Sequence, residues 1–133
     1  MIRHTKKLLG ARTLLFLGIL YTFIITYVFV SPKPDLPEIE FFLSLDKIGH
    51  FIIHAILSLI WLTYFFVKKK GASTALMVLS ILIFCLSYGI VIEVYQQMYV
   101  ASRQADLLDV VANSIGTLAG LILFMNVKKR IIF

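Results

Sequence analysis

Residues Ala72–Ile92 read ASTALMVLSILIFCLSYGIVI, an apolar stretch without a single charged residue. About 20 such residues, wound into an α-helix, span the roughly 30 Å hydrocarbon core of a bilayer. Three further stretches have a similar length and character: Thr13–Val30, Ile48–Val67 and Val110–Val127. Backbone amides and carbonyls find no water in lipid, so each stretch should satisfy them internally as a helix. The sequence therefore predicts an all-α membrane protein with four transmembrane helices in one bundle, near residues 13–30, 46–67, 72–97 and 106–127.

The composition supports a lipid environment and excludes several other classes of protein. The chain has 133 residues, of which 60% are hydrophobic, against roughly 45–50% in a typical soluble domain. The net charge of +6 does not indicate nucleic acid binding, because the basic residues form short clusters between apolar stretches. The single cysteine, Cys85, lies inside an apolar stretch, and no Cys/His metal-binding spacing occurs. We therefore predict no nucleic acid partner, no resident cofactor and no metal site of that type.

The distribution of charge predicts the orientation of the chain in the membrane. Ten of the 13 basic residues lie on one side of the predicted helices, and the positive-inside rule assigns that side to the cytoplasm. Both termini are therefore expected inside (N-in/C-in). The proline-containing connector at residues 31–37 is expected outside, followed by a short interfacial stretch at Glu40–Leu45. The ten basic residues are Arg3, Lys6, Lys7, Arg12, Lys68, Lys69, Lys70, Lys128, Lys129 and Arg130; the acids, on the other side, are Asp35, Glu38, Glu40, Asp46, Glu93, Asp106 and Asp109.

The second predicted helix carries ionisable residues on one face. Asp46, His50 and His54 follow one another at intervals of four, which places them on the same side of a helix. One interpretation is a histidine that is oriented by a carboxylate and handles a proton or a ligand. The other is an Asp46 helix cap and histidines that bond to neighbouring helices. We favour the functional interpretation for His50 and the structural one for His54.

The third and fourth predicted helices carry further polar residues near the same outer surface. Glu93 and Gln96 close the third helix; the glutamate is either a structural partner of Arg103 or His50, or a general acid or base. The fourth helix begins with a polar stripe that continues into a GxxxG motif, which permits close approach between membrane helices. We expect the polar groups of three helices to form one site, because they lie within a few turns of the outer surface. Asp106 opens the fourth helix, and the stripe consists of Asp109, Asn113, Gly116 and Gly120.

These residues also carry a family resemblance. The fragments are Asp46-Lys47-x-x-His50-Phe51, Glu93-x-x-Gln96 and Arg103-x-x-Asp106-x-x-Asp109-x-x-x-Asn113-x-x-Gly116-x-x-x-Gly120. In order and spacing they resemble the VanZ-like family of bacterial membrane proteins, most strongly over residues 46–120. The resemblance implies one VanZ-like domain over residues 1–133, in the bacterial cytoplasmic membrane. It also implies a family link to resistance against the glycopeptide teicoplanin, without an established biochemical activity. His54 is not part of the pattern.

The sequence leaves three functions open. The first is binding of an anionic cell-envelope lipid, a lipid-linked cell-wall precursor or a lipoglycopeptide, with Arg103 and Lys47 beside the polar cluster. The second is an acid/base enzyme acting on a lipid-linked phosphate or ester, with His50, Glu93 and Asp109 as catalytic candidates. The third is a structural or assembly protein. Carboxylates would also suit a divalent cation. The expected ligand-binding residues are Asp46, Lys47, His50, Glu93, Gln96, Arg103, Asp106, Asp109 and Asn113; Gly116 and Gly120 are expected to pack helices.

Overall fold

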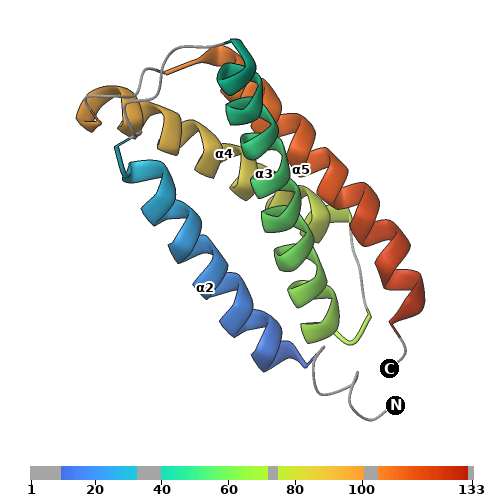
Figure 1. Cartoon of the computed structure of the whole chain (residues 1–133). Coiled ribbons are helices and arrows are strands. Elements are labelled where there is room, and N and C mark those ends of the chain that lie inside the picture. Colours follow the sequence, from blue (N-terminus) through green and yellow to red (C-terminus); the bar gives the residue numbers. More distant parts are fainter. Residues whose placement is uncertain (1–9, 33–39, 72–74, 101–104, 132–133) are drawn as a thin grey trace.

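The structure, a computed structural model, describes residues 10–32, 40–71, 75–100 and 105–131, with the side chains of 40–44 left aside. Four helices follow one another: α2 (Ala11–Val30), α3 (Glu40–Lys68), α4 (Ala75–Tyr99) and α5 (Leu107–Val127). A short 3-10 turn, η1 (Lys128–Arg130), continues α5. The helices run alternately in opposite directions along the bundle (Figure 1). The described residues contain no strand, so the prediction of an all-α fold with four helices is confirmed.

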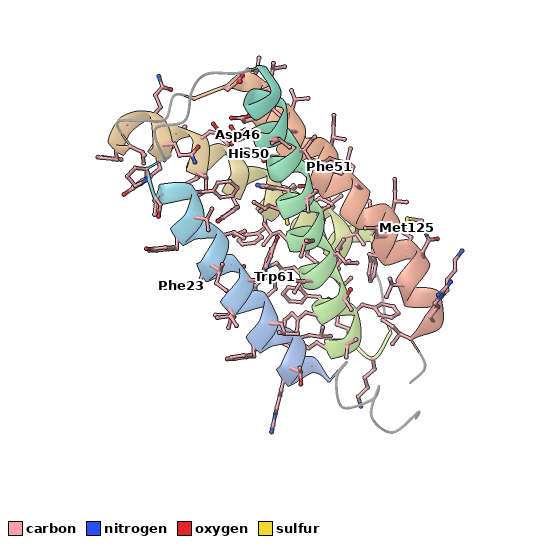
Figure 2. The ribbon with its side chains drawn as sticks, viewed as in Figure 1. Phe23, Asp46, His50, Phe51, Trp61 and Met125 are labelled. Atoms are coloured by element: carbon pink, nitrogen blue, oxygen red, sulfur yellow. The ribbon has the colours of Figure 1, made fainter. Side chains whose placement is uncertain are left out.

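Each of the four helices is long and apolar enough to cross a membrane. The candidate spans are Ala11–Val30, Leu45–Lys68, Ala75–Tyr99 and Leu107–Arg130. Many large apolar side chains point away from the bundle, as Phe23 on α2 and Met125 on α5 do (Figure 2). A soluble monomer rarely exposes a continuous apolar surface of this extent. Lipid chains are the solvent that this surface fits.

The start of α3 differs from the expectation. This helix begins at Glu40, so the separate interfacial stretch expected at Glu40–Leu45 is part of α3, and its span starts with Leu45. Asp46 consequently lies inside the helix and is not its N-cap. Between Pro37 and Gly49 the chain has neither a proline nor a glycine, so no residue in this segment stops a helix from starting early. The other described boundaries lie within two residues of those expected; the expected start of α4 at residue 72 lies outside the described residues.

The most extensive helix pair is α3 and α5, and two glycines of α5 lie at its centre. A Cβ atom on Gly116 would collide with the carbonyl group of Phe51, and one on Gly120 would collide with the carbonyl oxygen of Ala55. Across the same contact, the Ser58 hydroxyl donates a hydrogen bond of 3.0 Å to the Thr117 carbonyl. Small residues let two backbones approach in this way. This close approach brings the polar stripe of α5 against that of α3.

Side-chain hydrogen bonds join α2 to the rest of the bundle. The Tyr21 hydroxyl donates to the Ile53 carbonyl over 2.9 Å, and the Trp61 indole donates to the Thr22 hydroxyl over 3.2 Å. Further along α2, the hydroxyls of Thr26 and Tyr88 lie 2.7 Å apart. These bonds satisfy polar groups that lipid would leave without a partner. They fix α2 beside both α3 and α4.

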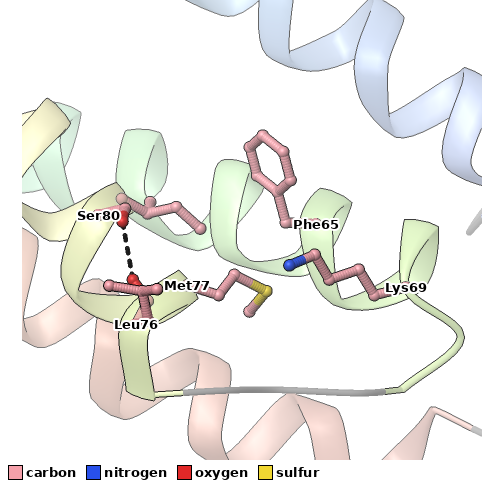
Figure 3. Close-up of a pocket in the computed structure, with 6 residues that line it drawn as sticks. Phe65, Lys69, Leu76, Met77 and Ser80 are labelled. Atoms are coloured by element: carbon pink, nitrogen blue, oxygen red, sulfur yellow. Dashed lines mark hydrogen bonds between the residues drawn. The ribbon is translucent and has the colours of Figure 1, made fainter.

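Apart from Lys47, the lysines and arginines that the structure describes gather at one end of the bundle. Arg12 begins α2, Lys68–Lys70 follow α3, and Lys128–Arg130 follow α5. The turn after α3 includes Gly71 at φ 87°, a conformation that favours glycine. A hollow of about 270 Å³ lies at this end between α3 and α4, with Phe65 and Met77 in its wall and Lys69 at its side (Figure 3). The polar cluster described next lies at the opposite end.

Candidate functional site

Polar side chains from three helices meet where α3 and α5 begin and where α4 ends. Asp46, Lys47 and His50 come from α3, and Figure 2 places Asp46 and His50 near the start of that helix. Glu93 comes from the last turns of α4, and Asp109 and Asn113 from the first turns of α5. Asp106 precedes α5 as its N-cap. We call these seven residues the polar cluster.

The imidazole of His50 lies at the centre of the polar cluster. Its Nδ1 is 3.0 Å from the amide oxygen of Asn113 and 3.7 Å from Oε1 of Glu93. Its other nitrogen, Nε2, is 3.8 Å from Oδ2 of Asp109. The ring of Phe29, on α2, stacks on the imidazole with the centroids 4.9 Å apart. Two helices, α4 and α5, thus supply polar neighbours to this residue of α3, and α2 supplies an aromatic one.

An exposed ion pair covers the buried part of the polar cluster. The ammonium of Lys47 is 2.7 Å from Oδ2 of Asp106 and 3.3 Å from Oδ1 of Asp109. The side chains of Lys47 and Asp106 are 29% and 42% exposed, whereas that of Asp109 is only 7% exposed. Asp106 also accepts a hydrogen bond from the Leu108 amide as the cap of α5. The hydrogen bond from Lys47, and then that from the Leu108 amide, lowers the pKa of the Asp106 carboxyl group.

Several buried polar atoms below this ion pair have no hydrogen-bond partner among the described residues. They are both carboxylate oxygens of Glu93, the amide nitrogen of Asn113 and both ring nitrogens of His54. Glu93 is only 3% exposed. A buried polar group without a partner lowers the stability of the fold, and such groups are uncommon in native proteins. Water or a ligand that donates hydrogen bonds would satisfy the two oxygens of Glu93.

The structure brings most of the expected site residues together, with two exceptions, Gln96 and Arg103. The amide of Gln96 instead donates to the Phe29 carbonyl over 2.7 Å, and so joins α4 to the end of α2. Arg103 lies outside the described residues. His54 lies one turn deeper than His50 and is fully buried, but the hydrogen bond to a neighbouring helix that we expected for it is not formed.

Two neighbours of the polar cluster were not expected from the sequence. Phe29 gave no signal, because one aromatic residue in an apolar helix looks like any other. Gly89 lies four residues before Glu93, on the same face of α4. A Cβ atom on Gly89 would lie 3.0 Å from Cε1 of His54 and 3.0 Å from the amide nitrogen of Asn113. This spacing from Glu93 is the signal that could have identified it.

Four apolar helices with a buried histidine–carboxylate cluster at one end define a multi-pass helical membrane protein. The model of the VanZ/LLP1 family matches residues 11–129, and the chain belongs to this family. The family resemblance noted in the sequence is therefore confirmed. Searches of curated proteins and of solved structures returned no match.

Proposed function

We propose that the polar cluster binds the head group of an anionic cell-envelope lipid or of a lipoglycopeptide-type ligand. The observation that carries this proposal is Glu93, whose two carboxylate oxygens are buried without a partner among the described residues. If the cluster only held helices together, a neutral residue at this position would serve better, since an unpaired buried carboxylate is costly. Hydroxyl or amide groups of a sugar or peptide head group would supply the missing donors.

The exposed ion pair suggests where such a ligand would enter. Lys47 is the exposed cation of the polar cluster and already interacts with two carboxylates. A phosphate or carboxylate of the ligand would replace Asp109 as one partner of Lys47, because the ammonium is a point charge with three rotatable donors and can pair with any nearby anion. The head group would then reach Glu93 and Asn113. The apolar outer surface of the helices would accommodate the acyl chain.

The charge distribution supports an orientation for this site. Positive residues favour the cytoplasmic side of a membrane, and the described basic clusters lie at the end opposite the polar cluster. We therefore place the chain in the bacterial cytoplasmic membrane with both termini inside and the polar cluster facing out. A lipid-linked cell-wall precursor or a glycopeptide such as teicoplanin would approach from that face.

A lipid titration tests the proposal. The purified protein in detergent is titrated with short-chain phosphatidylglycerol, and with short-chain phosphatidylcholine as the neutral probe, while thermal unfolding is followed. We expect the anionic lipid to raise the Tm of the wild type. Lys47→Gln should weaken the apparent affinity for this lipid at least tenfold. The control Lys129→Gln removes the same charge at the opposite end and should leave the response unchanged. Equal effects of the two substitutions, or equal responses to the two lipids, would refute the proposal.

A second candidate function is acid/base catalysis, which the surroundings of His50 favour. A carboxylate lies within 4 Å of each ring nitrogen, so the imidazole could accept a proton on one side while its cationic form is stabilised on the other. The substrate would be a lipid-linked phosphate or ester. Release of phosphate or of free acid from such a lipid by the wild type, with loss in His50→Gln, would support catalysis over binding alone.

A further inference from the structure

We propose that Asp46, His50 and Asp109 together bind a divalent transition-metal ion of the Zn²⁺ or Mn²⁺ type. Each of the three residues offers one ligand atom, and these atoms lie within 4.8 Å of one another. Two carboxylates and one imidazole form a donor set that suits these two ions. Ligands bind Zn²⁺ at about 2.0–2.2 Å, so small side-chain rotations would close the three donors around one ion.

The hydrogen bonding of His50 prepares its Nε2 atom for this role. A metal-binding histidine commonly donates its second N–H to an oxygen acceptor, which fixes the tautomer and the ring orientation. Here Nδ1 lies 3.0 Å from the amide oxygen of Asn113, an atom that can only accept. The proton therefore resides on Nδ1, and the lone pair of Nε2 faces Oδ2 of Asp109 across 3.8 Å. A metal ion placed between these two atoms would accept both as ligands.

A second and independent observation is the unpaired carboxylate of Glu93 beside the same imidazole. Glu93 is 3% exposed, and neither of its oxygens has a hydrogen-bond partner among the described residues. Its Oε1 lies 3.7 Å from Nδ1 of His50, so the ring has acidic groups on both sides. A carboxylate buried in this way either takes up a proton or pairs with a cation, and a bound metal ion would be such a cation.

The charges of the polar cluster as a whole also favour a divalent ion. The polar cluster contains four carboxylates, of which Asp106 and Asp109 share the ammonium of Lys47. That lysine contacts Oδ1 of Asp109 and leaves Oδ2 directed at His50. The ion would thus occupy the side of Asp109 that Lys47 does not use. The four carboxylates belong to Asp46, Glu93, Asp106 and Asp109.

Metal binding to the purified protein tests this site without any lipid ligand. The protein is purified with a tag that lacks histidine, stripped with a chelator and equilibrated with Zn²⁺ or Mn²⁺. Bound metal is measured by mass spectrometry and, for Mn²⁺, by electron paramagnetic resonance. We expect one ion per chain and a metal-dependent rise in Tm. Asp46→Asn and Asp109→Asn should each weaken binding at least tenfold, and Asn113→Ala, which changes only the residue that orients His50, about 10- to 100-fold.

The control is His54→Gln, which removes an imidazole one turn below His50 that belongs neither to the polar cluster nor to the three donors. This variant should bind the metal with nearly wild-type affinity. If Asp109→Asn fails to fold, Asp46→Asn decides the question, because Asp46 is only half-buried. Less than one ion per chain in the wild type, or unchanged binding in folded Asp46→Asn, would overturn the proposal. The lipid titration is repeated in the presence of a chelator. Lipid binding is then measured without metal, so a failure of the metal site can be told apart from a failure of head-group binding.

Discussion

Substitution of Gly116 by alanine tests the close contact that assembles the polar cluster. The added Cβ would meet the carbonyl oxygen of Phe51, and would lie 2.9 Å from its carbonyl carbon and 3.0 Å from its Cα. All three are backbone atoms of α3, so no side-chain rotation relieves the collision. Overpacking typically destabilises a protein by about 1–3 kcal/mol. Because the backbone of α3 cannot move aside easily, we expect a destabilisation near the upper end of this range. The gain in helix propensity from glycine to alanine, about 0.8–1.0 kcal/mol, leaves a net destabilisation of about 2 kcal/mol.

The matched control for this experiment is Gly49→Ala in α3. A Cβ atom on Gly49 would have no neighbour within 4 Å, so only the gain in helix propensity remains and this variant should be at least as stable as the wild type. Both variants are unfolded in mixed detergent micelles, and the free energy of unfolding is compared by circular dichroism. If Gly116→Ala proves as stable as Gly49→Ala, α3 and α5 do not approach as closely as the structure has them.

Three further outcomes are expected. Lys47→Met removes the ammonium that pairs with Asp109. A fully buried pair broken in this way would lower the free energy of unfolding by about 3–5 kcal/mol. Because Lys47 is partly exposed, we expect a decrease of about 2 kcal/mol. The double variant Lys47→Met with Asp109→Asn should recover much of this loss in chemical unfolding, and additive losses would contradict the ion pair. Because the folded pKa of Asp106 is lowered, its contribution to stability is complete above the unfolded value of 3.8 and disappears as the pH falls through the folded one. Asp106→Asn, which keeps a capping side chain, should flatten this acid limb of the Tm profile, and an unchanged limb would exclude Asp106 as its source. In intact cells an impermeant thiol reagent should label a cysteine at Pro34 and spare one at Lys69; the reverse pattern would invert the proposed orientation.

Much of the fold follows from composition and charge alone. The four apolar stretches predicted the four helices because lipid permits few other structures for them. The limit of the second span near Asp46 was predicted to within one residue, but the helix itself begins earlier, at Glu40. Within this helix Lys47 reaches its partners Asp106 and Asp109 on another part of the chain. Such compensation between helices distant in sequence is not visible in a local pattern.

The membership of the polar cluster was easier to predict than its contacts. Spacing of four along a helix placed Asp46 and His50 on one face, and shared depth brought Glu93 and Asn113 toward them. The partner of each residue depends on the rotation of whole helices, which the sequence does not state. Gln96, for example, shares the face of Glu93 but bonds to the end of α2. Whether His54 finds a hydrogen-bond partner likewise depends on the exact packing of α4, and among the described residues it has none.

The most direct test of the proposed binding site is a comparison of Glu93→Gln with the wild type for both stability and bound lipid. An unpaired buried charge lowers the stability of the fold, so a neutral group of the same shape should keep or raise the Tm. The same substitution removes the acceptor that we assign to the head group. Both proteins are purified in mild detergent, their Tm is measured, and retained lipid is identified by native mass spectrometry. The account predicts that Glu93→Gln has an equal or higher Tm and loses an anionic lipid that the wild type retains. A lower Tm with the same lipid still bound would contradict it and would make Glu93 a structural residue.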